Sequence, residues 1–227
     1  MRVRRLTLQD FRSWHSVQLE AHSGANLLLG PNGVGKSNIL EAIHVCALGF
    51  SPRSRSEKDL VRWGTDRFVA RVEAAQDDEP IELAASCDLS GRKDVRVNGQ
   101  AARLFSKLVG HLTVVGLYPE DLQLVRGGPE LRRSFLDALV CQNDPAMVDT
   151  LRDYARVVKQ RSAALKEPEK FDGNVREVLD HQMLELARPI LERRMDTIDD
   201  LFPRVGRLHS ELSGGTRAKL GLCLAFA

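Results

Sequence analysis

Eight consecutive residues combine glycines, a lysine and a hydroxyl group in an order that binds phosphate. Glycines let backbone N–H groups turn toward a ligand without a Cβ in the way. These N–H groups and the positive end of a following helix attract phosphate oxygens. In such a loop the lysine reaches the β- and γ-phosphates and the serine holds Mg²⁺. The run fits G-x-x-x-x-G-K-[ST] and predicts a nucleoside triphosphate site made by Gly30, Pro31, Asn32, Gly33, Val34, Gly35, Lys36, Ser37 and the adjoining Asn38.

The residues on either side of this loop provide the context that the pattern requires. Residues 25–29 form a short apolar run, which predicts a buried strand. Residues 37–48 carry apolar side chains at helical spacing and predict a helix. A strand, a glycine-rich turn and a helix together make a P-loop. The alternative is a glycine turn that joins a strand to a helix without binding anything.

Composition restricts the class of protein. The chain has 227 residues, enough for one or two domains, with 43% hydrophobic residues and a formal net charge of +2. No segment approaches the roughly 18 consecutive apolar residues of a membrane span, and no secretion signal follows the basic N-terminus. We therefore expect a cytoplasmic protein with no membrane partner. The cysteines form no C-x-x-C pair and are expected to be reduced thiols: Cys46, Cys87, Cys141 and Cys223.

Basic residues gather in local clusters although the net charge is small. Such clusters can follow the phosphate backbone of DNA, or they can be solvated charged faces of helices and loops. The sequence leaves both interpretations open. The clusters contain Arg2, Arg4, Arg5, Arg53, Arg55, Lys58, Arg132, Arg133, Arg188, Arg193 and Arg194.

Periodicity predicts an α/β protein with a helical extension. Residues 2–8 and 16–20 predict a hairpin ahead of the P-loop, and residues 68–98 predict an antiparallel meander with period two. Residues 112–117 are apolar and β-branched, and are expected to join residues 25–29 in the central sheet, which would then be mixed. Later, a strand is expected to end at a turn formed by residues 127–129, and a helix to start near Pro129.

Two long helical patterns follow. They cover residues 144–166 and 175–201, separated by a polar break at 167–174. Two such helices around a short polar loop make an antiparallel helical hairpin, which we interpret as an arm. The chain then reaches Ser213, Gly214 and Gly215 ahead of a helix-prone tail. Three such residues form either a flexible turn or a second anion site.

These motifs together resemble the RecF family, ABC-type ATPases related to the heads of SMC and Rad50 proteins. The resemblance depends most on residues 119–137, with the acidic pair after Pro119, the Gly127-Gly128-Pro129 turn and the Phe135-Leu136-Asp137 end. The P-loop and the Leu-Ser-Gly-Gly run at 212–215 are similar as well, although Thr216 stands where the ABC-type signature has glutamine.

The resemblance implies a fold and a division of the chain. The fold is an ABC-type P-loop ATPase head with a mixed sheet and an antiparallel β meander, plus a helical arm domain. The head would cover residues 1–128 and the arm residues 129–205. Residues 206–227 would begin the signature helix that returns to the head.

The resemblance also implies an activity. ATP and Mg²⁺ would bind at the P-loop, and Ser213, Gly214 and Gly215 of a second copy would cap the nucleotide, so that an ATP-dependent homodimer closes on double-stranded or gapped DNA. Slow, DNA-stimulated hydrolysis would release the dimer. RecR and RecO would be partners in loading the RecA recombinase.

Two further residues are assigned by the same resemblance. Arg12 would approach the nucleotide, with a surface arginine in a turn as the alternative. Gln123 would be a metal-sensing residue that acts with Ser37 at Mg²⁺.

The sequence departs from the family pattern in two places. No acidic residue follows Glu211, so we expect the Walker B carboxylates to be missing and no catalytic residue to be present. The second long helix also runs almost directly into the signature, which suggests that residues are omitted near 214–216.

Two alternatives to this function remain open. One is a structural ATPase head of the SMC or Rad50 kind, in which the hairpin is a short coiled coil. The other is an interaction module that binds nucleotide without turnover.

Overall fold

The computed structural model describes residues 1–54, 56–76, 79–102, 105–166 and 173–212. It divides into two compact units, Met1–Glu120 and Asp121–Ala227. The boundaries expected at residues 128 and 205 stay predictions. None of the described helices is long and apolar enough to cross a membrane.

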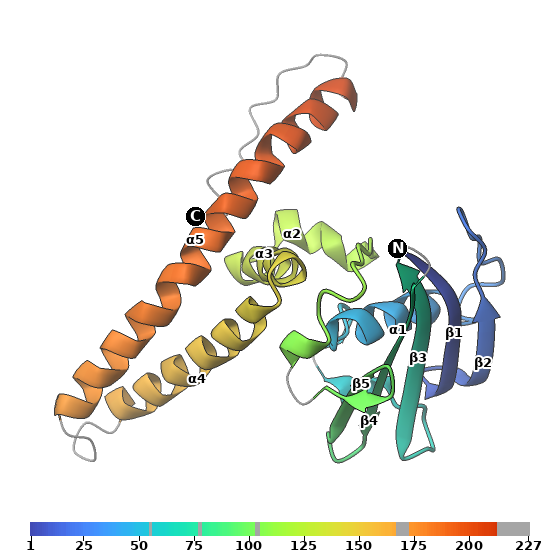
Figure 1. The fold of residues 1–227 in the computed structure, drawn as a ribbon, viewed down its shortest axis with the longest axis horizontal. Coiled ribbons are helices and arrows are strands. Elements are labelled where there is room, and N and C mark those ends of the chain that lie inside the picture. The colour runs from blue at the N-terminus through green and yellow to red at the C-terminus, as the bar shows by residue number, and fades with distance from the viewer. Residues whose placement is uncertain (55, 77–78, 103–104, 167–172, 213–227) are drawn as a thin grey trace. The chain divides into compact units, whose positions relative to one another are not determined.

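The first unit contains a six-stranded antiparallel sheet with the order β2-β1-β3-β4-β5-β6 (Figure 1). The N-terminal hairpin and the meander predicted from period-two patterns are both confirmed. Register agrees with this pattern, since Leu6 and Leu8 of β1 lie opposite Val72 and Ala70 of β3. The strands are β1 Arg2–Phe11, β2 Trp14–Glu20, β3 Arg67–Gln76, β4 Glu79–Asp88, β5 Lys93–Val97 and β6 Gln100–Ala101.

Helix α1, Lys36–Leu48, packs against this sheet and closes the core of the unit (Figure 1). Its buried residues Ala42, Val45 and Cys46 lie on the side that faces the strands. At one end of the core the rings of Phe11 and Phe68 meet edge to face, with centroids 5.1 Å apart. The sheet therefore supplies a rigid base for the helix that follows the glycine-rich loop.

The two strands expected to complete a mixed sheet are not formed. Residues 25–29 and 112–117 have no strand structure, and their side chains are largely exposed. Leu27 and Leu29 are 81% and 82% exposed, and Val115 and Leu117 are 87% and 89% exposed. A strand needs a neighbour for its N–H and C=O groups, and no described strand pairs with either segment. The sheet that the structure describes is consequently antiparallel throughout.

The second unit consists of helices. Its longer helices pack through a small apolar cluster formed by Val140, Met147 and Ile190. Residues 119–126 form a short 3-10 turn and α2, so the strand expected before Gly127 is wrong, whereas the helix expected at Pro129 is confirmed. The helices of this unit are α2 Gln123–Arg126, α3 Pro129–Asn143, α4 Ala146–Lys166 and α5 Gly173–Leu212. The described 3-10 turns are Glu57–Leu60 and Phe105–Lys107 in the first unit, and Pro119–Leu122 where the two units meet in the sequence.

Helices α4 and α5 lie side by side, as the helical pattern predicts (Figure 1). An ion pair between Arg161 of α4 and Asp180 of α5 joins them near the 167–172 connection. Helix α5 is longer than expected, because it continues through Pro203 to Leu212. The Ser-Gly-Gly run and the suggested omission near residues 214–216 lie outside the described residues.

Candidate nucleotide site

The glycine-rich loop ends where α1 begins, at a glycine that no other residue could replace without strain. Gly35 is the N-cap of α1 and has φ +103°, a conformation that side chains with a Cβ rarely adopt. A Cβ at this position would lie 2.4 Å from the hydroxyl of Ser13 and 2.7 Å from the indole nitrogen of Trp14. The loop is therefore packed directly onto the turn of the β1–β2 hairpin.

Hydrogen bonds join the start of α1 to the same hairpin turn. The indole N–H of Trp14 donates to the carbonyl of Gly35 at 3.1 Å. The side-chain amide of Asn38 donates to the hydroxyl of Ser13, also at 3.1 Å. These bonds fix the first turn of the helix, from which the predicted phosphate-binding groups project.

The side chains of Lys36 and Ser37 lie where the loop meets the first turn of α1. The ammonium group of Lys36 donates to the carbonyls of Gly30 and Pro31, at 2.7 Å each, and so lies across the loop. Ser37 is exposed in the first turn of α1. The described residues contain no cluster of three or more histidine, cysteine or acidic side chains that could hold a metal ion. A Mg²⁺ ion here would depend on the Ser37 hydroxyl and on nucleotide phosphates, a common arrangement for this metal.

The side chain of Arg12 is held by the buried carboxylate of Glu41, which lies on helix α1. Glu41 is completely buried, and it accepts from Nη2 and Nε of Arg12 at 2.7 and 3.1 Å. Arg12 has φ +54°, a left-handed conformation that is strained for a residue with a side chain. Arg12 lies in the turn between β1 and β2, so its approach to the nucleotide and the alternative of a surface arginine in a turn both stay predictions.

Sequence reasoning singled out Arg12 but missed its partner. A single glutamate within an amphipathic helix predicts a solvated position, and nothing local distinguishes Glu41 from that case. Ser51 and Arg53 also contact this carboxylate, with Oγ of Ser51 at 2.6 Å and Nη1 of Arg53 at 3.1 Å. In the sequence, the one indication that Glu41 has partners is that Ser51 and Arg53 follow soon after the helix.

The described residues leave the remaining site assignments untested. Gln123 is exposed at the start of α2, in the second unit. Its role at Mg²⁺ stays a prediction. Ser213, Gly214 and Gly215 lie outside the described residues.

Several of the basic residues proposed as a DNA-following surface have acidic partners in the described structure. Arg5 pairs with Glu20 and Glu73 on the sheet. In the second unit Arg194 makes a two-pronged contact with Asp137 at 2.7 and 2.9 Å. These pairs favour the interpretation of charged faces at those positions.

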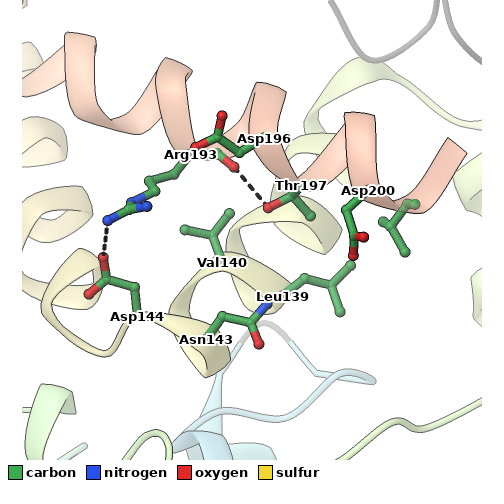
Figure 2. Close-up of a pocket in the computed structure, with 9 residues that line it drawn as sticks. Leu139, Val140, Asn143, Asp144, Arg193, Asp196, Thr197 and Asp200 are labelled. Atoms are coloured by element: carbon green, nitrogen blue, oxygen red, sulfur yellow. Dashed lines mark hydrogen bonds and ion pairs between the residues drawn. The ribbon is translucent and has the colours of Figure 1, made fainter.

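A groove of about 450 Å³ lies between α3 and α5 of the second unit. Figure 2 shows Arg193 reaching across from α5 to Asp144, at a distance of 3.3 Å. Asp196 and Asp200 also line the groove, so its lining contains three carboxylates and one guanidinium. Like charges repel, and this groove is therefore unsuited to a triphosphate. The P-loop remains the candidate site.

The three cysteines that the structure describes do not offer a nucleophile. Burial raises the pKa of the Cys46 thiol to about 12. Burial, with Asp137 and Asp144 nearby, raises that of Cys141 to about 12 as well. Cys46, Cys87 and Cys141 are free of disulfides. Since the thiolate is the reactive form, these residues stay inert near neutral pH.

Comparison with known proteins gives a family match. The family described as the RecF/RecN/SMC N terminal domain matches residues 2–227. DNA replication and repair protein RecF of Symbiobacterium thermophilum is 38% identical over 208 residues, which are 92% of this chain and 55% of the relative. The protein of that name from Streptococcus suis is 36% identical over 214 residues, 94% of this chain and 58% of the relative. The chain thus spans somewhat more than half the length of these relatives.

A solved structure gives the same result in three dimensions. The recombination mediator protein RecF-ATP of the RecFOR pathway superposes with a TM-score of 0.88 and 27% sequence identity. The match covers 94% of this chain and 58% of the other. The described fold is therefore that of an ATPase head of the SMC and RecF type.

Proposed function

The chain belongs to the RecF/RecN/SMC N-terminal domain family, and from that premise we propose that it forms the ATP-binding head of a RecF-type DNA repair and replication protein. The observation that carries the proposal is the packing of the glycine-rich loop onto the hairpin turn. Gly35 admits no Cβ there, and Lys36 and Ser37 follow it at the start of α1. This packing supports a loop whose backbone N–H groups would cradle phosphates.

ATP binding would control association of two copies. The γ-phosphate would contact Lys36 and, through Mg²⁺, Ser37. The signature residues Ser213, Gly214 and Gly215 of a second copy would close over it, and Gln123 would sense the metal. Nucleotide that binds the dimer more tightly than the monomer shifts the equilibrium toward the dimer. Slow hydrolysis, stimulated by DNA in the full-length protein, would then release it.

The cellular role follows from the same proposal. The dimer would bind double-stranded or gapped DNA in the cytoplasm and help load the RecA recombinase, with RecR and RecO as partners. Helices α4 and α5 would form the arm. Support comes from the family match and from the RecFOR-pathway relative.

A structural head of the SMC or Rad50 kind is a second candidate, favoured by one observation. Helix α5 has 40 residues and α4 has 21, so part of α5 extends beyond its partner and could continue a coiled coil. A single-turnover ATPase assay on the full-length protein, with and without double-stranded DNA, separates the candidates from each other and from a module that binds without turnover.

Lys36→Met tests the nucleotide site itself. Loss of charge-assisted hydrogen bonds, worth about 1.5–3 kcal/mol each, weakens binding about 10- to 100-fold. ATP-dependent dimers should disappear in light scattering. Lys159→Met, which removes an exposed lysine from α4, is the matched control and should behave like the wild type. ATP-driven dimers that persist in Lys36→Met would contradict the proposal.

A further inference from the structure

A carboxylate without contact to solvent lies one helical turn beyond Ser37, and two arginines converge on it. We propose that Glu41 is a positioning residue, which holds the guanidinium groups of Arg12 and Arg53 beside the phosphate-binding loop before nucleotide arrives. This inference rests on the proposed ATP site and adds to it a device that sets the affinity for nucleotide.

Both oxygens of Glu41 are fully occupied. Oε1 accepts from Nη2 of Arg12 at 2.7 Å and from the Ser51 hydroxyl at 2.6 Å. Oε2 accepts from Nε of Arg12 and from Nη1 of Arg53, at 3.1 Å each. Hydrogen bonds in which both groups are charged are among the strongest in proteins. The carboxylate therefore fixes the planes of two guanidinium groups at once.

The same network reaches the first turn of α1. Nη1 of Arg53 also donates to the side-chain oxygen of Asn38 at 3.1 Å. Asn38 follows Ser37 directly and donates in turn to Ser13. An unbroken chain of contacts thus links the buried carboxylate to the residue next to the predicted Mg²⁺ ligand.

Exposure indicates what the arginines are held for. The buried carboxylate of Glu41 faces two guanidinium groups, and the carboxylate of Glu120 lies 3.8 Å from Nε of Arg53, so these four side chains are balanced in formal charge. The arginine side chains are 24% and 26% exposed, whereas Glu41 is fully buried. Their exposed parts are available to an anion, and an arginine already held in place loses less freedom on binding. Arg12 is fixed further, since Nη1 donates to the Asp59 carbonyl at 3.0 Å.

Calorimetric titration with ATP and Mg²⁺ tests the proposal on the full chain, at a temperature where circular dichroism shows each variant to be folded. Glu41→Gln keeps the shape and removes the charge, and we expect about tenfold weaker ATP binding. Arg12→Ala should have a similar effect, and the double variant should be no more than about twofold weaker than Arg12→Ala, because the two residues act as one unit. The matched control is Glu73→Gln, which removes the charge of the glutamate paired with Arg5 on the sheet. It should bind ATP within twofold of the wild type.

A conservative variant separates positioning from mere structure. Arg12→Lys keeps the positive charge but cannot make the two-pronged contact, and should weaken ATP binding about fivefold in a folded protein. This variant decides the matter if Glu41→Gln does not fold. Wild-type affinity in folded Glu41→Gln, or in Arg12→Lys, would overturn the inference while leaving the ATP site intact. Absence of ATP uptake by the wild type would instead refute the proposed function.

Discussion

Helix α1 and residues 25–29 flank the same phosphate-binding loop, yet they differ in what surrounds them. The helix is packed on the sheet, and its first turn is bonded to the hairpin turn through Gly35 and Asn38. The segment before the loop contains Leu27 and Leu29, both more than 80% exposed. One side of the loop is therefore fixed by contacts among the described residues, and the other side is not.

This difference separates two kinds of information in a sequence. The hairpin turn and the loop lie only about 20 residues apart, and their contacts are made by small groups in fixed conformations. An apolar run indicates only that a segment favours burial. It does not specify the neighbour that would bury it, so the same pattern is compatible with a central strand and with an exposed segment.

The largest expected effect comes from comparing a leucine of the packed sheet with a leucine of the exposed segment before the loop. Leu8 of β1 is fully buried, and Leu8→Ala should lower the free energy of unfolding by about 2–5 kcal/mol, through lost transfer energy and a cavity. Leu27→Ala should change it by less than about 0.5 kcal/mol, as is usual at exposed positions. Urea unfolding followed by circular dichroism measures both. Equal losses would mean that Leu27 is buried in solution.

The ion pairs provide the next comparison. Arg12→Ala leaves a buried carboxylate with one fewer partner and should cost about 3 kcal/mol of unfolding free energy. Arg5 is 40% exposed in its pairs with Glu20 and Glu73, and Arg5→Ala should cost less than about 1 kcal/mol because solvent screens exposed charges. The same unfolding measurement applies. A larger loss for Arg5→Ala than for Arg12→Ala would contradict the interpretation of the network around Glu41.

Two glycines of the loop allow the same comparison between a closely packed position and an open one. Gly35→Ala places a Cβ against Ser13 and Trp14 and should cost about 2–3 kcal/mol from strain and overpacking, with loss of ATP binding. Gly33 also has a positive φ, +83°, but nothing lies within 4 Å of a Cβ there. Gly33→Ala should cost only about 1 kcal/mol. Thermal unfolding separates the two, and equal shifts would argue against the close packing at Gly35.

The smallest expected effect concerns pH. The thiol of Cys46 has an ordinary pKa of 9.0, which burial raises to about 12 in the folded protein. Above pH 9 the unfolded thiol ionises while the folded one stays protonated, so stability is full below pH 9 and declines as pH rises toward 12. Between pH 9 and pH 10 this thiol should cost about 1 kcal/mol. Cys46→Ala should remove that part of the slope, and an unchanged slope would exclude Cys46 as its source.

The sequence predicted the parts of the fold that depend on short-range patterns. Period-two alternation identified the hairpin and the meander, the helical period identified α1, α4 and α5, and Pro129 indicated the start of α3. Lys36 and Ser37 follow from residue type and spacing alone. Helix α5 was predicted to end at Leu201, but it continues through Pro203 to Leu212.

What could not be predicted depends on contacts between distant residues. Glu41 is an unremarkable helical glutamate in the sequence, and only the folded chain brings Arg12 to it from 29 residues away. The strands expected at 25–29 and 112–117 fail for a related reason, since pairing partners cannot be deduced from the apolar runs themselves. The mixed sheet depended on both.

The bond between the Trp14 indole and the Gly35 carbonyl has a practical consequence. The chain has only two tryptophans, and the other, Trp63, is 97% exposed. Indole emission depends on its surroundings, so Trp14 is a built-in optical probe of the loop and Trp63 contributes a nearly constant background. Replacing Trp63 with phenylalanine would leave one fluorophore, through which arrival of a ligand at the loop could be followed without any label.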